Sequence, residues 1–138
     1  MTTLIEQLAS AKGIANDYVD AWGNPALVTL DSKAAMLAAM GYKVDDEAAL
    51  QIQLEDEKRQ HWQLPIDPVM VVRTADAIVL ELRLPITLVN EELTWEVATE
   101  QGDTVKGTLL PVDGEMVSVA HFADVEYQAY RVALSNEL

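Results

Sequence analysis

The chain has 138 residues, and its 23 acidic and 9 basic side chains give a formal net charge of −14 at pH 7. Such a surface repels phosphate groups, which argues against nucleic-acid and anionic-membrane partners. The absence of cysteine excludes disulfides, thiolate metal sites and cysteine nucleophiles, and it agrees with a cytoplasmic location. No apolar run approaches the roughly 18 residues of a membrane span, and the N-terminus has no signal-peptide pattern.

Helical periodicity dominates residues 1–64, where we expect a small helical unit. Thr3 and Glu6 fit a capping box for a first helix, which is predicted to end at Gly13.

A second helix is predicted over residues 14–22. It would end at Gly23, because glycine takes a left-handed conformation cheaply and Pro25 prevents continuation. Tyr18 and Trp22 lie four residues apart, so we expect them to share one face and to pack on the next helix.

Two further helices are predicted before the pattern changes. One covers residues 30–40, with Thr29 as its N-cap and Gly41 as its stop. The other runs from Asp45, as N-cap, to about residue 62. Its second half is mostly polar, which indicates an exposed surface.

The acidic run on that last helix is interpreted as a solvated face. Glu55, Asp56 and Glu57 are consecutive, so on a helix they diverge around the axis and do not converge on a ligand. Glu55 and Arg59 are expected to form a weak i,i+4 ion pair.

The periodicity changes from helical to alternating at a linker that contains Pro65 and Pro68. Residues 65–138 are therefore predicted to form an antiparallel β-sandwich of the immunoglobulin type, following the helical subdomain of residues 1–64 in an α+β chain. A single sheet packed on the helices is an alternative. The expected strands cover residues 69–73, 78–84, 93–98, 104–110, 116–120 and 127–134.

No catalytic, cofactor or metal-binding residue is assigned from the sequence. His61 and His121 are the only histidines, and no serine lies in a nucleophile turn that would complete a hydrolytic triad. The 6 glycines are scattered, so there is no phosphate-binding loop and no cofactor is expected.

Aromatic side chains are the remaining candidates for a binding role. Flat rings stack on the apolar faces of sugars, so Trp62, Tyr127 and Tyr130 are candidate sugar or interdomain contacts. Trp62 is the best exposed candidate, because it follows a polar helix end. Trp95 is in phase with Leu93 and is expected in the core.

The glycine and isoleucine at positions 13 and 14, Tyr18, the Asp20-x-Trp22-Gly23 sequence and the capped helix ending in Met-Gly carry a resemblance. Over residues 8–42 the chain resembles the N-terminal region of bacterial 4-α-glucanotransferases, the amylomaltases of the maltodextrin-utilising type. The resemblance resumes at Pro68 to Arg73. Many relatives have a proline where this chain has Leu30, a position that tolerates leucine.

The resemblance implies a non-catalytic accessory domain of an enzyme that transfers α-1,4-glucan segments. Its reaction needs two carboxylates about 5 Å apart, and the resemblance places them in a barrel beyond Leu138. The implied partners are that barrel, in the same polypeptide, and malto-oligosaccharides. We expect a fragment whose sandwich lacks one or two terminal strands, leaving an open sheet edge for self-association.

A protein of a different class is the alternative. The chain would then be a stand-alone acidic protein-interaction domain that uses its sheet edge or its helical unit. A small independent hydrolase is disfavoured, because no nucleophile–base pair can be assembled from the residues present.

Overall fold

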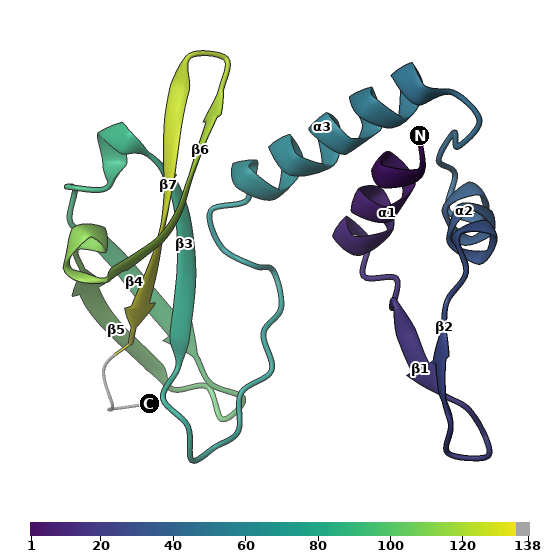
Figure 1. Ribbon diagram of the computed structural model, residues 1–138. Helices are drawn as coiled ribbons and strands as arrows, with labels where there is room; N and C mark the ends of the chain where they lie inside the picture. The colour runs from purple at the N-terminus through teal and green to yellow at the C-terminus, as the bar shows by residue number, and fades with distance from the viewer. Residues whose placement is uncertain (135–138) are drawn as a thin grey trace. The chain divides into compact units, whose positions relative to one another are not determined.

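The computed structural model describes residues 1–134, which form an α+β fold (Figure 1). The chain divides into two compact units, Met1–Gln60 and His61–Leu138. The first is mainly helical and the second is an antiparallel β-sandwich. None of the helices in residues 1–134 is long and apolar enough to cross a membrane.

Helices α1 (Thr2–Ala11), α2 (Leu30–Ala39) and the first turns of α3 (Glu47–Gln63) surround the core of the first unit. One apolar side of each helix supplies this core, as expected for amphipathic helices. Its buried members are Ile5, Leu8, Ala9, Leu37, Leu50 and Leu54.

The N-cap of α2 is as predicted, whereas the capping box of α1 is wrong. The Thr29 hydroxyl accepts a hydrogen bond from the Ser32 amide at 3.2 Å. Helix α1 already includes Thr3, and its N-cap, Met1, makes no side-chain bond. The Glu6 carboxylate instead accepts a hydrogen bond from Lys33 Nζ at 2.5 Å, because α2 brings that ammonium group alongside α1.

Helix α3 also differs in detail from the prediction. Its N-terminal cap is Asp46 and not the predicted Asp45. The Asp46 carboxylate accepts a hydrogen bond from the Ala48 amide at 3.0 Å. Arg59 pairs with Asp56 at 3.2 Å and not with Glu55. Side chains three or four residues apart both lie on one helix face, so Arg59 could pair with either Asp56 or Glu55.

The helix predicted over residues 14–22 is wrong, because this segment begins a β-hairpin. Strands β1 (Asp17–Val19) and β2 (Pro25–Leu27) pair in antiparallel register, with Tyr18 opposite Ala26. Gly23, with φ of +83°, lies in the turn between them and does not end a helix. Tyr18 is 55 % exposed and Trp22 is 85 % exposed, so neither packs on α2 as predicted.

In the part of the second unit that the structure describes, five strands form two antiparallel sheets. One sheet has the order β3-β7-β6 and the other pairs β4 with β5. Their bounds are β3 Val79–Pro85, β4 Leu93–Ala98, β5 Thr104–Leu109, β6 Glu115–Phe122 and β7 Val125–Ala133. Two short 3₁₀ helices, Ile86–Leu88 and Pro111–Asp113, connect strands of the two sheets.

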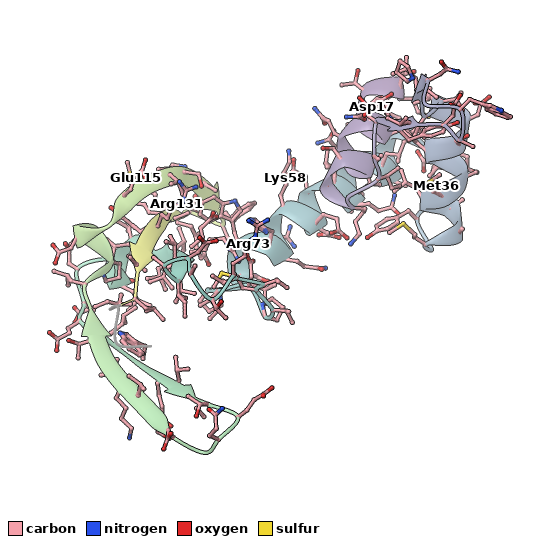
Figure 2. All side chains as sticks on the ribbon, turned by 90° about the horizontal axis from the view of Figure 1, so that it is seen from below. Asp17, Met36, Lys58, Arg73, Glu115 and Arg131 are labelled. Carbon is pink, nitrogen blue, oxygen red and sulfur yellow. The ribbon has the colours of Figure 1, made fainter. Side chains whose placement is uncertain are left out.

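Alternation along the strands separates the sandwich core from the outer faces. Leu93 of β4 and Leu109 of β5 pack against this core, which is why the two sheets form a sandwich. On the edge strand β6, Glu115 lies opposite Arg131 of β7, and Figure 2 shows the two side chains next to each other. The buried core residues are Leu82, Leu84, Val89, Tyr130 and Val132.

The strand predicted over residues 69–73 is wrong. These residues lie within the described part of the chain and are in neither sheet. Val69 is 80 % exposed and Val71 is 95 % exposed. Residues 69–73 have the composition of a strand, but no neighbouring segment among residues 1–134 supplies the backbone partners that a strand needs.

Candidate functional site

Trp62 and Tyr127, two of the predicted contact residues, lie together in the second unit. Trp62 is in the last turn of α3, and its ring centroid lies 6.5 Å from that of Tyr127 on β7. The ring centroid of Phe122, at the end of β6, lies 6.2 Å from that of Tyr127. The interplanar angles are 60° and 66°, so the three rings share no common plane for a long flat ligand. Any stacking surface is therefore one ring wide.

Tyr130 lies on the opposite face of β7 and belongs to the core. It is three residues from Tyr127, and an odd separation reverses the side of a strand. Tyr130 is 8 % exposed, and its hydroxyl donates to Gln128 Oε1 at 2.8 Å. Tyr130 therefore contributes packing, and only Trp62 and Tyr127 keep surface for a predicted contact.

The two histidines are engaged separately. His61 makes an edge contact with Trp62, with ring centroids 6.4 Å apart. His121 Nε2 lies 3.2 Å from Glu126 Oε1, its cross-strand neighbour on β7. Within residues 1–134, no group of three or more histidine or carboxylate side chains is placed to hold a metal ion.

A buried arginine, which sequence reasoning missed, fixes the chain that follows α3 to the outer face of the β3-β7-β6 sheet. Arg83 is 2 % exposed, and its amide donates to the Pro65 carbonyl at 2.8 Å. Its guanidinium donates to the Leu64 carbonyl at 2.9 Å and to the Asp67 carboxylate at 2.6 Å. These bonds hold residues 64–67 beside β3. The sequence signal for this buried arginine was its position between two leucines of a strand.

A three-residue polar cluster links the helices of the first unit. Lys12 Nζ lies 3.2 Å from Glu57 Oε2, and the Tyr42 hydroxyl donates to the other oxygen of Glu57. That hydroxyl bond is the main reason why the pKa of Glu57 lies below its ordinary value, and the same bond raises the pKa of Tyr42. The Tyr42 hydroxyl and the Glu57 carboxylate together raise the pKa of Lys12. Glu57 is thus partly buried, and the solvated face predicted for the acidic run does not extend to it.

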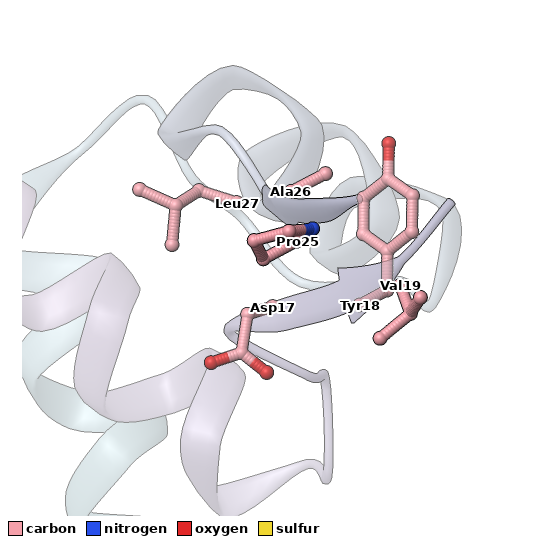
Figure 3. Close-up of a pocket in the computed structure, with 6 residues that line it drawn as sticks. All are labelled: Asp17, Tyr18, Val19, Pro25, Ala26 and Leu27. Carbon is pink, nitrogen blue, oxygen red and sulfur yellow. The ribbon is translucent and has the colours of Figure 1, made fainter. Parts of the chain in front are cut away.

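The β1–β2 hairpin has apolar side chains exposed on both of its faces. Six residues of its two strands line an open hollow of about 500 Å³ (Figure 3). Asp17, Val19, Pro25 and Leu27 share one face by their register, while Tyr18 and Ala26 lie on the other. Trp22 projects from the turn. The Asn-Pro pair was the sequence signal for this turn, although it was assigned to a helix end.

Comparison with known proteins agrees with this architecture. The family model described as the MalQ N-terminal beta sandwich domain matches residues 65–138, which is more than half of the chain. The crystal structure of amylomaltase from Corynebacterium glutamicum is similar over 100 % of this chain, with a TM-score of 0.66 and 17 % identity. The match spans 20 % of that amylomaltase chain. A comparison with curated protein sequences gives no match.

The fold and the comparisons define the class of protein, which is an α+β domain with an N-terminal helical unit and an amylomaltase-type β-sandwich. The chain belongs to the MalQ N-terminal beta sandwich domain family. At 17 % identity, the likeness to the C. glutamicum enzyme shows a shared fold.

Proposed function

We propose that this chain is the N-terminal accessory domain of a 4-α-glucanotransferase and is catalytically inert by itself. The parent enzyme would transfer α-1,4-glucan segments between maltodextrins in the cytoplasm. The accessory domain would pack on a catalytic barrel in the same polypeptide, and it would position long glucans or support assembly.

The family match over residues 65–138 carries this proposal. The fold likeness supports it, because an amylomaltase has a similar fold across this chain, which spans 20 % of that enzyme. The side-chain geometry is compatible with an accessory role. The arginine, lysine and carboxylate groups described above bond to one another or to backbone, and such contacts stabilise a domain.

The proposal is tested on the complete gene. We expect its reading frame to continue past Leu138 into a barrel-sized sequence. The encoded polypeptide should convert maltotriose into longer and shorter oligomers, whereas the 138-residue chain should not. A stop codon after Leu138 would contradict the proposal and favour the stand-alone interaction domain. Transfer by the 138-residue chain alone would contradict its inertness.

Trp62 and Tyr127 are the residues for which we propose a glucan or interdomain contact. Titration of the 138-residue chain with maltoheptaose should change tryptophan emission at millimolar sugar if a pyranose ring stacks here. The variant Trp62→Phe should lose the response, while Trp22→Phe, which changes the tryptophan farthest from this cluster in sequence, should keep it. No response at millimolar sugar would set the glucan contact aside and leave the interdomain one.

A further inference from the structure

The β1–β2 hairpin exposes an unusual amount of apolar surface for an ordered element. Val19 is 71 % exposed, Leu27 is 79 % exposed and Trp22 is 85 % exposed. Tyr18, on the other face, is 55 % exposed. A single exposed apolar residue needs no explanation, but a contiguous group on one short element marks an interaction surface.

Hydrogen bonds hold this hairpin in shape at its base. There the Val28 amide donates to the Asn16 carbonyl at 2.9 Å. Lys33, 4 % exposed, donates from Nζ to Asn16 Oδ1 at 2.8 Å. A buried lysine of the helical core thus anchors the first strand.

The turn of the hairpin is held as firmly. The Asp20 carboxylate accepts hydrogen bonds from the amides of Trp22 and Asn24, both at 2.9 Å. The Asp20 amide donates to the Asn24 carbonyl at 2.9 Å. Isolated two-stranded hairpins are marginal in water, and here polar contacts keep the shape while the apolar side chains stay uncovered. The surface is therefore ordered before it meets a partner.

We propose that the β1–β2 hairpin is the surface by which this chain docks on the rest of its parent polypeptide. Trp22 inserts into an apolar cleft with a basic rim, and Val19 and Leu27 cover the wall of that cleft. The inference rests on the proposed function and goes beyond it by naming which surface makes the contact.

Three observations favour the rest of the parent polypeptide as the partner of the hairpin. The chain corresponds to 20 % of an amylomaltase, so most of such an enzyme is available as a partner. The hairpin carries Asp17 and Asp20 and no basic residue, and the whole chain has a net charge of −14. A second copy would bring like charges together, whereas a basic rim would attract them. Exposed Val19 and Leu27 cannot bond to sugar hydroxyls, but they suit a protein interface centred on a tryptophan.

The first test compares Trp22 in the 138-residue chain with Trp22 in the polypeptide encoded by the complete gene. Both are labelled with 5-fluorotryptophan, and the fluorine resonance of Trp22 is the one that disappears in Trp22→Phe. We expect a large H₂O-to-D₂O isotope shift for this resonance in the short chain and loss of most of that shift in the long polypeptide. Loss of the shift in the short chain as its concentration rises would identify a second copy and overturn the assignment.

The second test uses Leu27→Ser, with Ile52→Ser as the matched control. Ile52 is 62 % exposed on α3 and lies outside the hairpin. Leu27→Ser should leave the melting temperature of the helical unit unchanged in the 138-residue chain, because the side chain is free there, and should lower it in the long polypeptide. Ile52→Ser should change neither.

The outcomes separate this inference from the proposed function. A gene that ends at Leu138 would contradict both. A long, active glucanotransferase in which Trp22 keeps its full isotope shift, and in which Leu27→Ser behaves like Ile52→Ser, would overturn the docking surface alone.

Discussion

Glu57 is the centre of a polar contact that joins three separate parts of the first unit. Its carboxylate accepts hydrogen bonds from Lys12, the residue that follows α1, and from Tyr42 in the loop between α2 and α3. The side chains of Lys12 and Glu57 are 28 % and 20 % exposed, so solvent screens this pair only in part. We therefore expect it to contribute measurably to the stability of the helical unit.

Glu57→Gln should lower the free energy of unfolding of the first unit by about 1 to 2 kcal/mol at pH 7. The pKa of Glu57 is lowered from 4.5 in the folded chain. Its contribution is therefore present above pH 4.5 and is lost as the pH falls through the folded pKa. Urea unfolding at pH 7 and pH 3 should show a deficit in the variant that shrinks in acid.

Glu55→Gln is the control for that measurement. Glu55 is exposed and accepts only a 3.3 Å hydrogen bond from Gln51. It should change stability by a few tenths of a kcal/mol at either pH. A deficit in Glu57→Gln that stays constant between pH 7 and pH 3 would contradict the assigned ionisation.

Arg83 performs a comparable role in the second unit. We expect Arg83→Met to release residues 64–67 from β3 and to cost about 2 kcal/mol, since bonds to charged groups are lost. Limited proteolysis should then cut near residues 64–67 faster than in the wild-type chain. Arg83→Lys should give an intermediate rate, because an ammonium group cannot reproduce the guanidinium fork. Equal cleavage rates in all three chains would show that Arg83 does not hold this segment.

At the scale of elements, the β4–β5 pair depends on close packing between a tryptophan and a glycine. Trp95 of β4 lies opposite Gly107 of β5. A Cβ atom at Gly107 would lie 2.4 Å from Cζ2 of Trp95, well inside contact distance. The absence of a side chain at position 107 is therefore what lets the indole lie across β5.

Gly107→Ala should destabilise the second unit by about 1 to 3 kcal/mol, because the indole must move. Trp95→Phe removes the indole atoms nearest to position 107. The alanine substitution should therefore cost less in that background, and a double-mutant cycle by chemical denaturation measures the difference. Additive effects of the two substitutions would contradict this packing.

Elements with strong local signals were predictable from the sequence. The Thr29 cap and Gly41 placed α2 within one residue of its observed end. Strict alternation from Leu93 to Ala98 placed β4 correctly, because its two faces meet different surroundings.

Elements with short strands or absent partners were not predictable. Strands β1 and β2 have three residues each, too few to show alternation, and Tyr18 and Trp22 happen to have helical spacing. Residues 69–73 show strand composition, but pairing depends on chain segments elsewhere. The contact between Trp62 and Tyr127 joins residues far apart in sequence, so each was a candidate by itself and their meeting required the fold.

At the scale of the whole molecule, residues 1–134 contain two hydrophobic cores with no residue in common. Each compact unit also has its own buried cation, Lys33 in the first and Arg83 in the second. Cooperative unfolding follows shared packing, so two cores without common residues favour separate transitions.

Calorimetry of the 138-residue chain should therefore resolve two unfolding transitions. Glu57→Gln should shift only the transition of the helical unit, and Gly107→Ala only that of the sandwich. One transition that moves with both substitutions would show that the units unfold together.

The exposed valines of residues 69–72 have a practical consequence for purified material. A short apolar stretch of high β-propensity can stack with its own copies into fibrils. Pro68 before it and Arg73 after it are residues that interrupt such stacking. At pH 7 the charge of −14 adds mutual repulsion, which disappears near the isoelectric point of about 4.2 as carboxylates are neutralised. Preparations of this chain should therefore stay clear at neutral pH and deposit fibrils when brought to about pH 4.2, the isoelectric point.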